Sequence, residues 1–414
     1  MKKSGEIANR VLIVSQTFPP ASGIGGRRWA KFAKYLKKNG YEVEVIAAQL
    51  PSAEEQSWMR DVEGIKQHHY RHRYPDILSK IPNSLYQKLR YRLALTRAMF
   101  KADGTPYDRA VFDEIAFLEV LESRLNIFKP QTLIITSPPV NLVFYAAKIR
   151  DRYPEVKFIA DFRDPWLDGD HYGYANLRPK ALEAEKAKED FIVSQFDEIV
   201  SPWPLVVEGF SSRYPDSSSS FDLLAHGWDR DDIIGKAKPK IEVDIIYGGN
   251  LYKGFEPLLA YLARYAHEKN IKIEIYARSE IPQEILDSQG NFKVRKAIPV
   301  SDFFARVRQS KQLIFLIPER LKDGFPTKLL EFAATGKGIL AVGYSGTLSD
   351  LIVKKGLGSF VALDRLDEDF ENARKTLSKL SPDRKWIKDH EMSRVTEDLL
   401  KIIKELNTAG GSEE

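Results

Sequence analysis

The stretch VDIIYGGNL at residues 243–251 decides the fold. Its mostly apolar first half predicts a buried strand, and the paired glycines predict a tight turn after it. Helical periodicity follows over residues 255–267. The chain opens in the same way: the apolar run 11–14 leads through a turn-rich loop at 17–26 into a helix predicted at 27–38. The same pattern therefore starts twice, which indicates two α/β domains.

Apolar runs alternate with helix-like segments along most of the 414 residues, which favours parallel sheets. We place the boundary between the domains at 205/206, where one sheet is complete and the next begins. The predicted strands lie at 43–47, 132–136, 157–160, 198–201, 243–247, 271–276, 313–317 and 338–342, and further helices at 140–150, 180–195 and 393–406.

The composition excludes several kinds of chemistry. Cysteine is absent, so the chain has no disulfides, no thiolate zinc site and no cysteine nucleophile. No stretch reaches the roughly 18 apolar residues that a membrane span needs, so we expect a cytoplasmic protein. The formal net charge of +5 by itself identifies no partner.

The segment DGFPTKLLEFAATGKG at residues 323–338 is the most informative for chemistry. Pro326 suits the first position of a helix, and Gly336 suits its end. The early amides, around Thr327 to Leu329, would then point into the preceding loop and bind a diphosphate together with the Lys328 ammonium. Glu331, one turn further on, could accept hydrogen bonds from sugar hydroxyls. An ordinary helix with a surface lysine and glutamate is the alternative.

This segment resembles the acid–seven residues–acid motif of retaining GT-B glycosyltransferases, especially family 4. Asp323 and Glu331 occupy the two acidic positions, and residues 326–341 are similar to a subgroup that acts in bacterial surface-polysaccharide assembly. The resemblance implies that the first acid touches the transferred sugar and that the second binds the donor ribose. Asp323 is one methylene shorter than the usual glutamate. Phe325, just before the helix, is expected at the donor site.

Two further loops resemble the same family. The loop PPASGIGGR at residues 19–27 is similar to the family's first loop, which closes on the donor phosphates and the acceptor. The loop GGNLYKG at residues 248–254 is similar to the one that opens the second domain, where a basic pair holds the pyrophosphate. Asn250 stands at the usual arginine position of that pair. The residues expected to take part are Gly23, Gly25, Gly26 and Arg27 in the first loop, and Gly249, Asn250 and Lys253 in the second.

Ser137 and the segment 161–166 follow two predicted strands, where open α/β sheets bind ligands. Both recur in the same subgroup. Asp164 would orient or deprotonate an acceptor hydroxyl with Arg163 beside it, or the two residues would simply form a salt bridge. Asp168 and Asp170 match the Asp-x-Asp metal site of the other glycosyltransferase fold, but that fold has one nucleotide-binding domain. We therefore expect no bound metal.

The resemblance implies two Rossmann-like domains facing a cleft: an acceptor-binding domain at 1–205, completed by the last helix at 388–414, and a donor-binding domain at 206–387. It also implies transfer from a nucleoside diphosphate-sugar to a glycan or lipid-linked acceptor, with retention and without a cofactor. A sugar-nucleotide epimerase of the same fold and a non-catalytic binding or scaffold protein remain as alternatives.

The segment 65–105 differs from the rest of the chain in composition. Nine lysines and arginines lie between Lys66 and Lys101, where Asp76 is the one acid, and aromatic and leucine residues are interleaved with them. Three interpretations stay open: a solvated face, an RNA patch, or a surface for anionic lipid that would hold the protein on the inner face of the plasma membrane. We expect no nucleic-acid partner.

Overall fold

The chain folds into two α/β units. The computed structural model describes residues 9–21, 24–52, 58–167, 177–233, 240–278 and 290–409. Unit 1 comprises Met1–Ala225 together with Val395–Glu414, and unit 2 comprises His226–Arg394. Each unit is built on one parallel sheet.

The sheet of unit 1 has seven strands in the order β3-β2-β1-β4-β5-β6-β7. All neighbouring strands are parallel, and the strand order reverses between β1 and β4, which pair from Val11↔Thr132 to Val14↔Ile135. The strands are β1 (Arg10–Val14), β2 (Glu42–Ala48), β3 (Lys66–Tyr70), β4 (Thr132–Ser137), β5 (Lys157–Phe162), β6 (Glu198–Ser201) and β7 (Ser220–Leu223).

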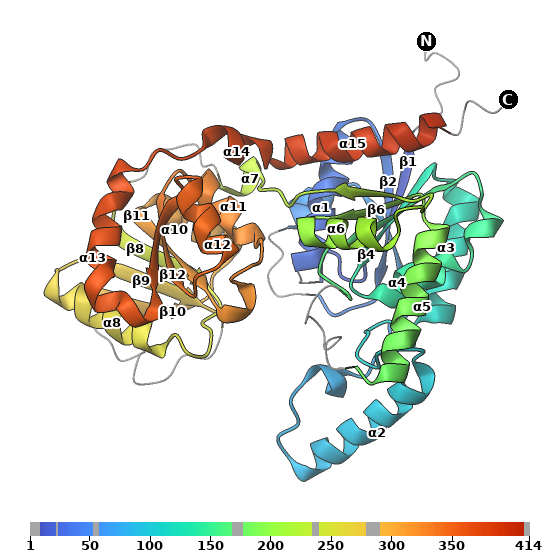
Figure 1. Ribbon diagram of the computed structural model, residues 1–414, viewed down its shortest axis with the longest axis horizontal. Helices are drawn as coiled ribbons and strands as arrows, with labels where there is room; N and C mark the ends of the chain where they lie inside the picture. The colour runs from blue at the N-terminus through green and yellow to red at the C-terminus, as the bar shows by residue number, and fades with distance from the viewer. Residues whose placement is uncertain are drawn as a thin grey trace. The chain divides into compact units, whose positions relative to one another are not determined.

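Helices cover this sheet because its central strands are apolar on both sides. On one face, Leu12 and Val14 pack with Phe117 of α3 and Leu142 of α4 in the main core of the unit. The α2 helix stands away from the sheet (Figure 1). The helices of the unit are α1 (Ile24–Lys38), α2 (Leu85–Lys101), α3 (Glu114–Phe128), α4 (Val140–Ala147), α5 (Pro179–Gln195) and α6 (Pro204–Arg213).

Unit 2 has a six-stranded parallel sheet in the order β10-β9-β8-β11-β12-β13. Two apolar clusters, one on Ile245 and Tyr247 and one on Ile246 and Leu313, include alternate residues of β8 and so lie on opposite faces. Its strands are β8 (Val243–Gly249), β9 (Ile273–Ala277), β10 (Phe292–Lys296), β11 (Ser310–Ile317), β12 (Gly338–Gly343) and β13 (Gly358–Ala362). Its helices are α7 (Arg230–Ile233), α8 (Glu256–Glu268), α10 (Val300–Arg308), α11 (Thr327–Ala334), α12 (Thr347–Lys354), α13 (Leu366–Thr376) and α14 (Arg384–Asp389).

The two-unit α/β architecture agrees with the prediction, but the division differs from 205/206. The sheet of unit 1 continues past that point, because α6 is followed by β7, which pairs with β6 from Glu198↔Ser220 to Ser201↔Leu223. The division therefore lies at Ala225/His226. The last helix, α15 (Met392–Ala409), starts in unit 2 and belongs to unit 1 from Val395 onward. Within the described ranges, no helix combines the length and the apolar character that crossing a bilayer requires.

Candidate functional site

The candidate site of unit 2 lies at the carboxyl ends of its central strands. β8 ends at Gly249, which pairs with Ala277 at the end of β9. The backbone leaves β8 with a φ of +151° at Gly249, a conformation that side chains disfavour. A Cβ at this position would also collide with the Lys328 ammonium and approach the Tyr247 hydroxyl. Glycine therefore lets the α11 lysine reach the end of β8.

α11 begins one residue later than expected. Pro326 is the N-cap, with an extended ψ of 136° and no side-chain capping bond, and Thr327 is the first helical residue. The Leu329 amide donates to the Pro326 carbonyl at 3.0 Å, so its expected role as an anion donor is corrected. Thr327 and Lys328 precede the residue that donates this first hydrogen bond. Their amides therefore lie at the positive end of the helix dipole.

Lys328 occupies the centre of this site. Its Nζ donates to the Gly248 carbonyl at 2.8 Å. Burial lowers the pKa of Lys328 to about 8, against the opposing effect of the Glu331 carboxylate and with a smaller lowering effect from Arg278. An anion bound here would stabilise the protonated form of Lys328, which burial and the nearby Arg278 disfavour.

Glu331 and Arg278 complete the charged group. Glu331 is 8% exposed and lies one turn beyond Thr327 on α11, close enough to Lys328 to affect its pKa. Arg278 directly follows β9, is exposed, and donates its backbone amide to the Gly249 carbonyl at 3.2 Å. The sequence reasoning did not single out Arg278. A basic residue immediately after a predicted strand was the signal that could have identified it.

The other expected donor-site residues are less closely associated. Asn250 is exposed, and its carbonyl accepts a hydrogen bond from the Tyr247 hydroxyl. Lys253 is exposed in the turn before α8. Phe325 packs on Trp386 and His390 of the α14 region, with ring centroids 6.1 and 5.7 Å away. Phe325 thus anchors the loop before α11 within unit 2.

Asp323 lies at the start of a different helix. Its Oδ1 accepts hydrogen bonds from the Thr347 amide at 3.1 Å and the Thr347 hydroxyl at 3.3 Å. Thr347 is the first residue of α12, so the carboxylate caps that helix. The side chain is exposed and couples the α11 loop to α12.

In unit 1, Ser137, Arg163, Asp164 and Gly25 come together at the carboxyl ends of β4 and β5. The Arg163 amide donates to the Ser137 carbonyl at 3.2 Å. The Arg163 Nε and the Asp164 Oδ2 form an ion pair at 3.1 Å, so the salt-bridge alternative of the sequence analysis is present. The Arg163 guanidinium lies directly over Gly25, where a Cβ would collide with it.

The first loop is held by backbone contacts. A Cβ at Gly26 would collide with the Thr17 carbonyl, so the start of α1 lies against the loop that follows β1. The Arg27 guanidinium stacks over the Trp58 ring at 5.2 Å. Gly23, Asp168 and Asp170 lie outside the described residues.

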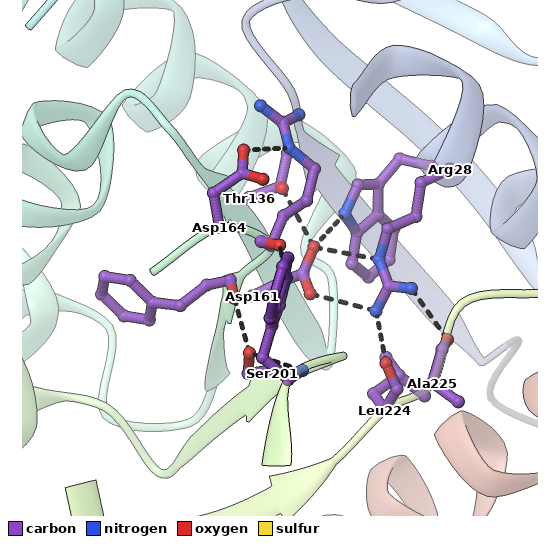
Figure 2. Close-up of polar contacts among 11 residues, drawn as sticks. Arg28, Thr136, Asp161, Asp164, Ser201, Leu224 and Ala225 are labelled. Atoms are coloured by element: carbon purple, nitrogen blue, oxygen red, sulfur yellow. Dashed lines mark hydrogen bonds and ion pairs between the residues drawn. The ribbon is translucent and has the colours of Figure 1, made fainter. Parts of the chain in front are cut away.

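A buried cluster centred on Asp161 supports the candidate site residues of unit 1 (Figure 2). The Asp161 carboxylate accepts hydrogen bonds from Thr136 Oγ1 at 2.9 Å, Trp29 Nε1 at 2.6 Å and Arg28 Nη2 at 3.1 Å. Arg28 also donates to the Leu224 and Ala225 carbonyls, both at 2.8 Å. The cluster therefore joins α1, β4 and β5 to the last residues of the first segment of unit 1. Periodicity does not reveal it, because its members are distant in sequence.

A metal site of three or more His, Asp or Glu side chains is not found among the described residues. The expectation of no bound metal stays a prediction, because Asp168 and Asp170 lie outside those residues.

Comparisons with known proteins identify the architecture. A glycosyltransferase from Rickettsia africae aligns with 97% of this chain and 99% of its own at a TM-score of 0.58 and 14% identity. Anabaena HepE, solved in complex with UDP and glucose, aligns with 96% of this chain and 99% of its own, at a TM-score of 0.58 and 10% identity. A UDP-GlcNAc 2-epimerase from Neisseria meningitidis aligns with 96% of this chain and 100% of its own, at a TM-score of 0.53 and 12% identity. The chain has the GT-B fold. No family model and no curated protein sequence matches it.

In this GT-B chain, the described site residues form two groups, each at the carboxyl ends of its own sheet. Gly249, Lys328 and Glu331 gather in unit 2, with Arg278 beside them. Gly25, Ser137, Arg163 and Asp164 gather in unit 1. These are the edges at which open α/β sheets bind ligands.

Proposed function

We propose that the protein is a glycosyltransferase whose unit 2 binds a nucleoside diphosphate-sugar. The observation that carries the proposal is the Lys328 ammonium at the start of α11, which donates to the Gly248 carbonyl and whose pKa burial lowers, with Glu331 and Arg278 close enough to act on it. A diphosphate would supply two negative charges within reach of the Thr327 and Lys328 amides. The GT-B fold supports the same ligand class.

In this proposal, Arg278 takes the place of the arginine that the resemblance expects at Asn250. Its backbone is hydrogen-bonded to Gly249, and its charge already acts on Lys328. Lys328 and Arg278 together would stabilise the negative charge that develops on the leaving diphosphate, a role that needs fixed cations rather than a proton donor. Lys253, which is exposed on the neighbouring turn, would contact the same phosphates.

Glu331 would accept hydrogen bonds from the ribose of the donor. Its carboxylate is nearly buried, and it lies one helical turn from the proposed phosphate contacts. Asp323 would act by positioning, because its carboxylate holds Thr347 at the start of α12. Transfer with retention and a role in surface-polysaccharide synthesis follow from the motif resemblance.

The acceptor would bind unit 1 near Ser137, Arg163 and Asp164. The ion pair between Arg163 and Asp164 would fix the carboxylate for hydrogen bonding to an acceptor hydroxyl. We propose a saccharide or lipid-linked saccharide as acceptor, with no cofactor and no metal. An epimerase is the second candidate, since the fold neighbours include UDP-GlcNAc 2-epimerases.

The test is donor binding and turnover in Glu331→Ala. A melting-temperature screen against UDP-, GDP-, ADP- and TDP-sugars first identifies the nucleotide. We then expect Glu331→Ala to weaken that donor roughly ten- to hundredfold, because a hydrogen bond to a charged group is lost. Product analysis with and without a saccharide acceptor separates transfer from epimerisation.

Glu268→Ala is the matched control, because Glu268 is an exposed carboxylate on α8 that pairs with Arg264. It should bind the donor as the unmodified protein does. Unchanged donor affinity in a folded Glu331→Ala protein would contradict the ribose assignment. A chain that binds none of the nucleotides would favour a scaffold function.

A further inference from the structure

The α2 helix exposes an apolar stripe along one side. Leu85, Leu89 and Leu93 follow one another at four-residue spacing, and Phe100 lies seven residues further on, so all four share a face. Their exposed fractions run from 58% for Leu89 to 90% for Phe100. Ile81, just before the helix, is 87% exposed. Such a continuous apolar surface is unusual for a face in contact only with water.

The opposite side of α2 is packed, so the helix is held in place with the stripe outward. Ala98 is fully buried, and Tyr91, Ala94 and Leu95 pack with it against Tyr74 and Leu78. The helix starts at Ser84, whose hydroxyl accepts the Gln87 amide while the Gln87 side chain accepts from the Ser84 amide. The stripe is therefore a fixed surface and not the exposed side of a frayed segment.

Basic residues border the stripe on both sides. Lys88 and Arg92 lie along one edge, and Arg90, Arg97 and Lys101 lie along the other. All five are exposed, and no acidic residue occurs from Leu85 to Lys101. Arg90 and Tyr86 are in cation–π contact at 5.7 Å, on the boundary between the two kinds of surface.

We propose that this face of α2 binds the surface of an anionic lipid bilayer, with the helix axis parallel to the membrane. The leucines and Phe100 would enter the boundary between headgroups and acyl chains, and the five cations on the two flanks would meet lipid phosphates. The protruding position of α2 in unit 1 leaves this face open (Figure 1). Pairing with α2 of a second copy would instead bring basic flanks together without an acid between them.

The proposal stands on unit 1 alone and does not depend on the donor site. The experiment is sedimentation of the full-length chain with vesicles of phosphatidylcholine mixed with phosphatidylglycerol, compared with vesicles of phosphatidylcholine only. We expect binding to the anionic vesicles and much weaker binding to the neutral ones. Lys88→Gln with Lys101→Gln should lower the partition coefficient about fivefold for each residue. Leu89→Glu with Leu93→Glu should lower it more than about tenfold.

Two matched controls use exposed residues elsewhere. Ile115→Glu changes an exposed isoleucine on α3, and Lys269→Gln with Lys293→Gln removes two exposed lysines from unit 2. Neither should alter vesicle binding. Equal losses in the α2 and control variants, or no binding of the folded protein to anionic vesicles, would overturn the proposal. A dimer in solution that Leu89→Glu with Leu93→Glu dissociates, without vesicle binding, would assign the face to a second copy instead.

Discussion

At the scale of single residues, Lys328 is a group whose charge changes near neutral pH. Burial places its pKa at about 8, so a growing fraction is neutral above that pH. An anion favours the protonated form, and affinity for a nucleoside diphosphate should therefore fall as pH rises through about 8. The fall should approach about tenfold for each pH unit well above the pKa. Calorimetric titrations of the bound nucleotide from near neutral to alkaline pH measure it.

Lys328→Arg supplies the control for this pH dependence. Arginine keeps its charge over the whole pH range, so the affinity of the Lys328→Arg variant for the nucleoside diphosphate should be nearly independent of pH. The unmodified protein should also take up protons on binding, which titrations in buffers of different ionisation enthalpy detect. A flat pH profile in the unmodified protein would show that Lys328 does not contact the anion.

Local spacing and the motif resemblance brought some of the candidate residues to attention. Lys328 and Glu331 were expected together because they lie on one predicted helix, three residues apart, and Gly249 because its loop resembles the one that opens the second domain of the family. Arg278 and the Asp161 cluster were not predicted. Arg278 reaches Lys328 through the pairing of β8 with β9, and Asp161 meets Arg28 across 133 residues. Such contacts depend on strand order, which periodicity does not provide.

At the scale of elements, Gly25 and Gly26 are adjacent glycines with different roles. A Cβ at Gly26 meets backbone of Thr17 and Phe18, whereas a Cβ at Gly25 meets the movable end of the Arg163 side chain. We expect Gly26→Ala to lower the free energy of unfolding by about 1–3 kcal/mol, because the loop and α1 must separate. Gly25→Ala should cost less stability, because Arg163 can move aside.

Urea unfolding of the two variants makes the comparison. Equal stability losses, or a larger loss in Gly25→Ala, would contradict the assignment of Gly26 to the contact between the loop and α1.

Edge strands show where the sequence reading of elements failed. Predicted strands match the central strands β1, β2, β4, β5 and β6 of unit 1 and β8, β9, β11 and β12 of unit 2. The four that were not predicted, β3, β7, β10 and β13, are the outer strands of the two sheets. Central strands are buried on both faces and read as apolar runs. β3 has the sequence KQHHY and β10 has FKVRK, so neither forms an apolar run.

At the scale of the whole molecule, the division between the units was misplaced for the same reason. The edge strand β7 was not predicted, so the first sheet was judged complete at residue 205. Unit 2 starts at His226, after β7 has completed the first sheet.

The C-terminal helix gives the prediction at this scale. Val395, Leu399 and Ile403 of α15 are fully or almost fully buried and lie in the part assigned to unit 1. Each such side chain contributes about 1.5–3 kcal/mol when buried, and together they amount to a large part of the roughly 5–15 kcal/mol that stabilises a domain. A chain that stops at Arg394 should therefore lose the cooperative unfolding of unit 1 in calorimetry.

A chain that stops at Ala409 is the control, because it keeps all of these buried residues. It should melt as the full-length protein does. Two unchanged transitions in the chain that stops at Arg394 would show that α15 is dispensable for unit 1.

The discontinuity of unit 1 also sets an order on its synthesis. A ribosome makes residues 1–225 first, all of unit 2 next, and Val395–Glu414 last. While unit 2 is synthesised, the surface of the first segment that α15 will cover therefore remains exposed to solvent. Nascent chains arrested anywhere before residue 395 should consequently be bound by chaperones that recognise apolar surface.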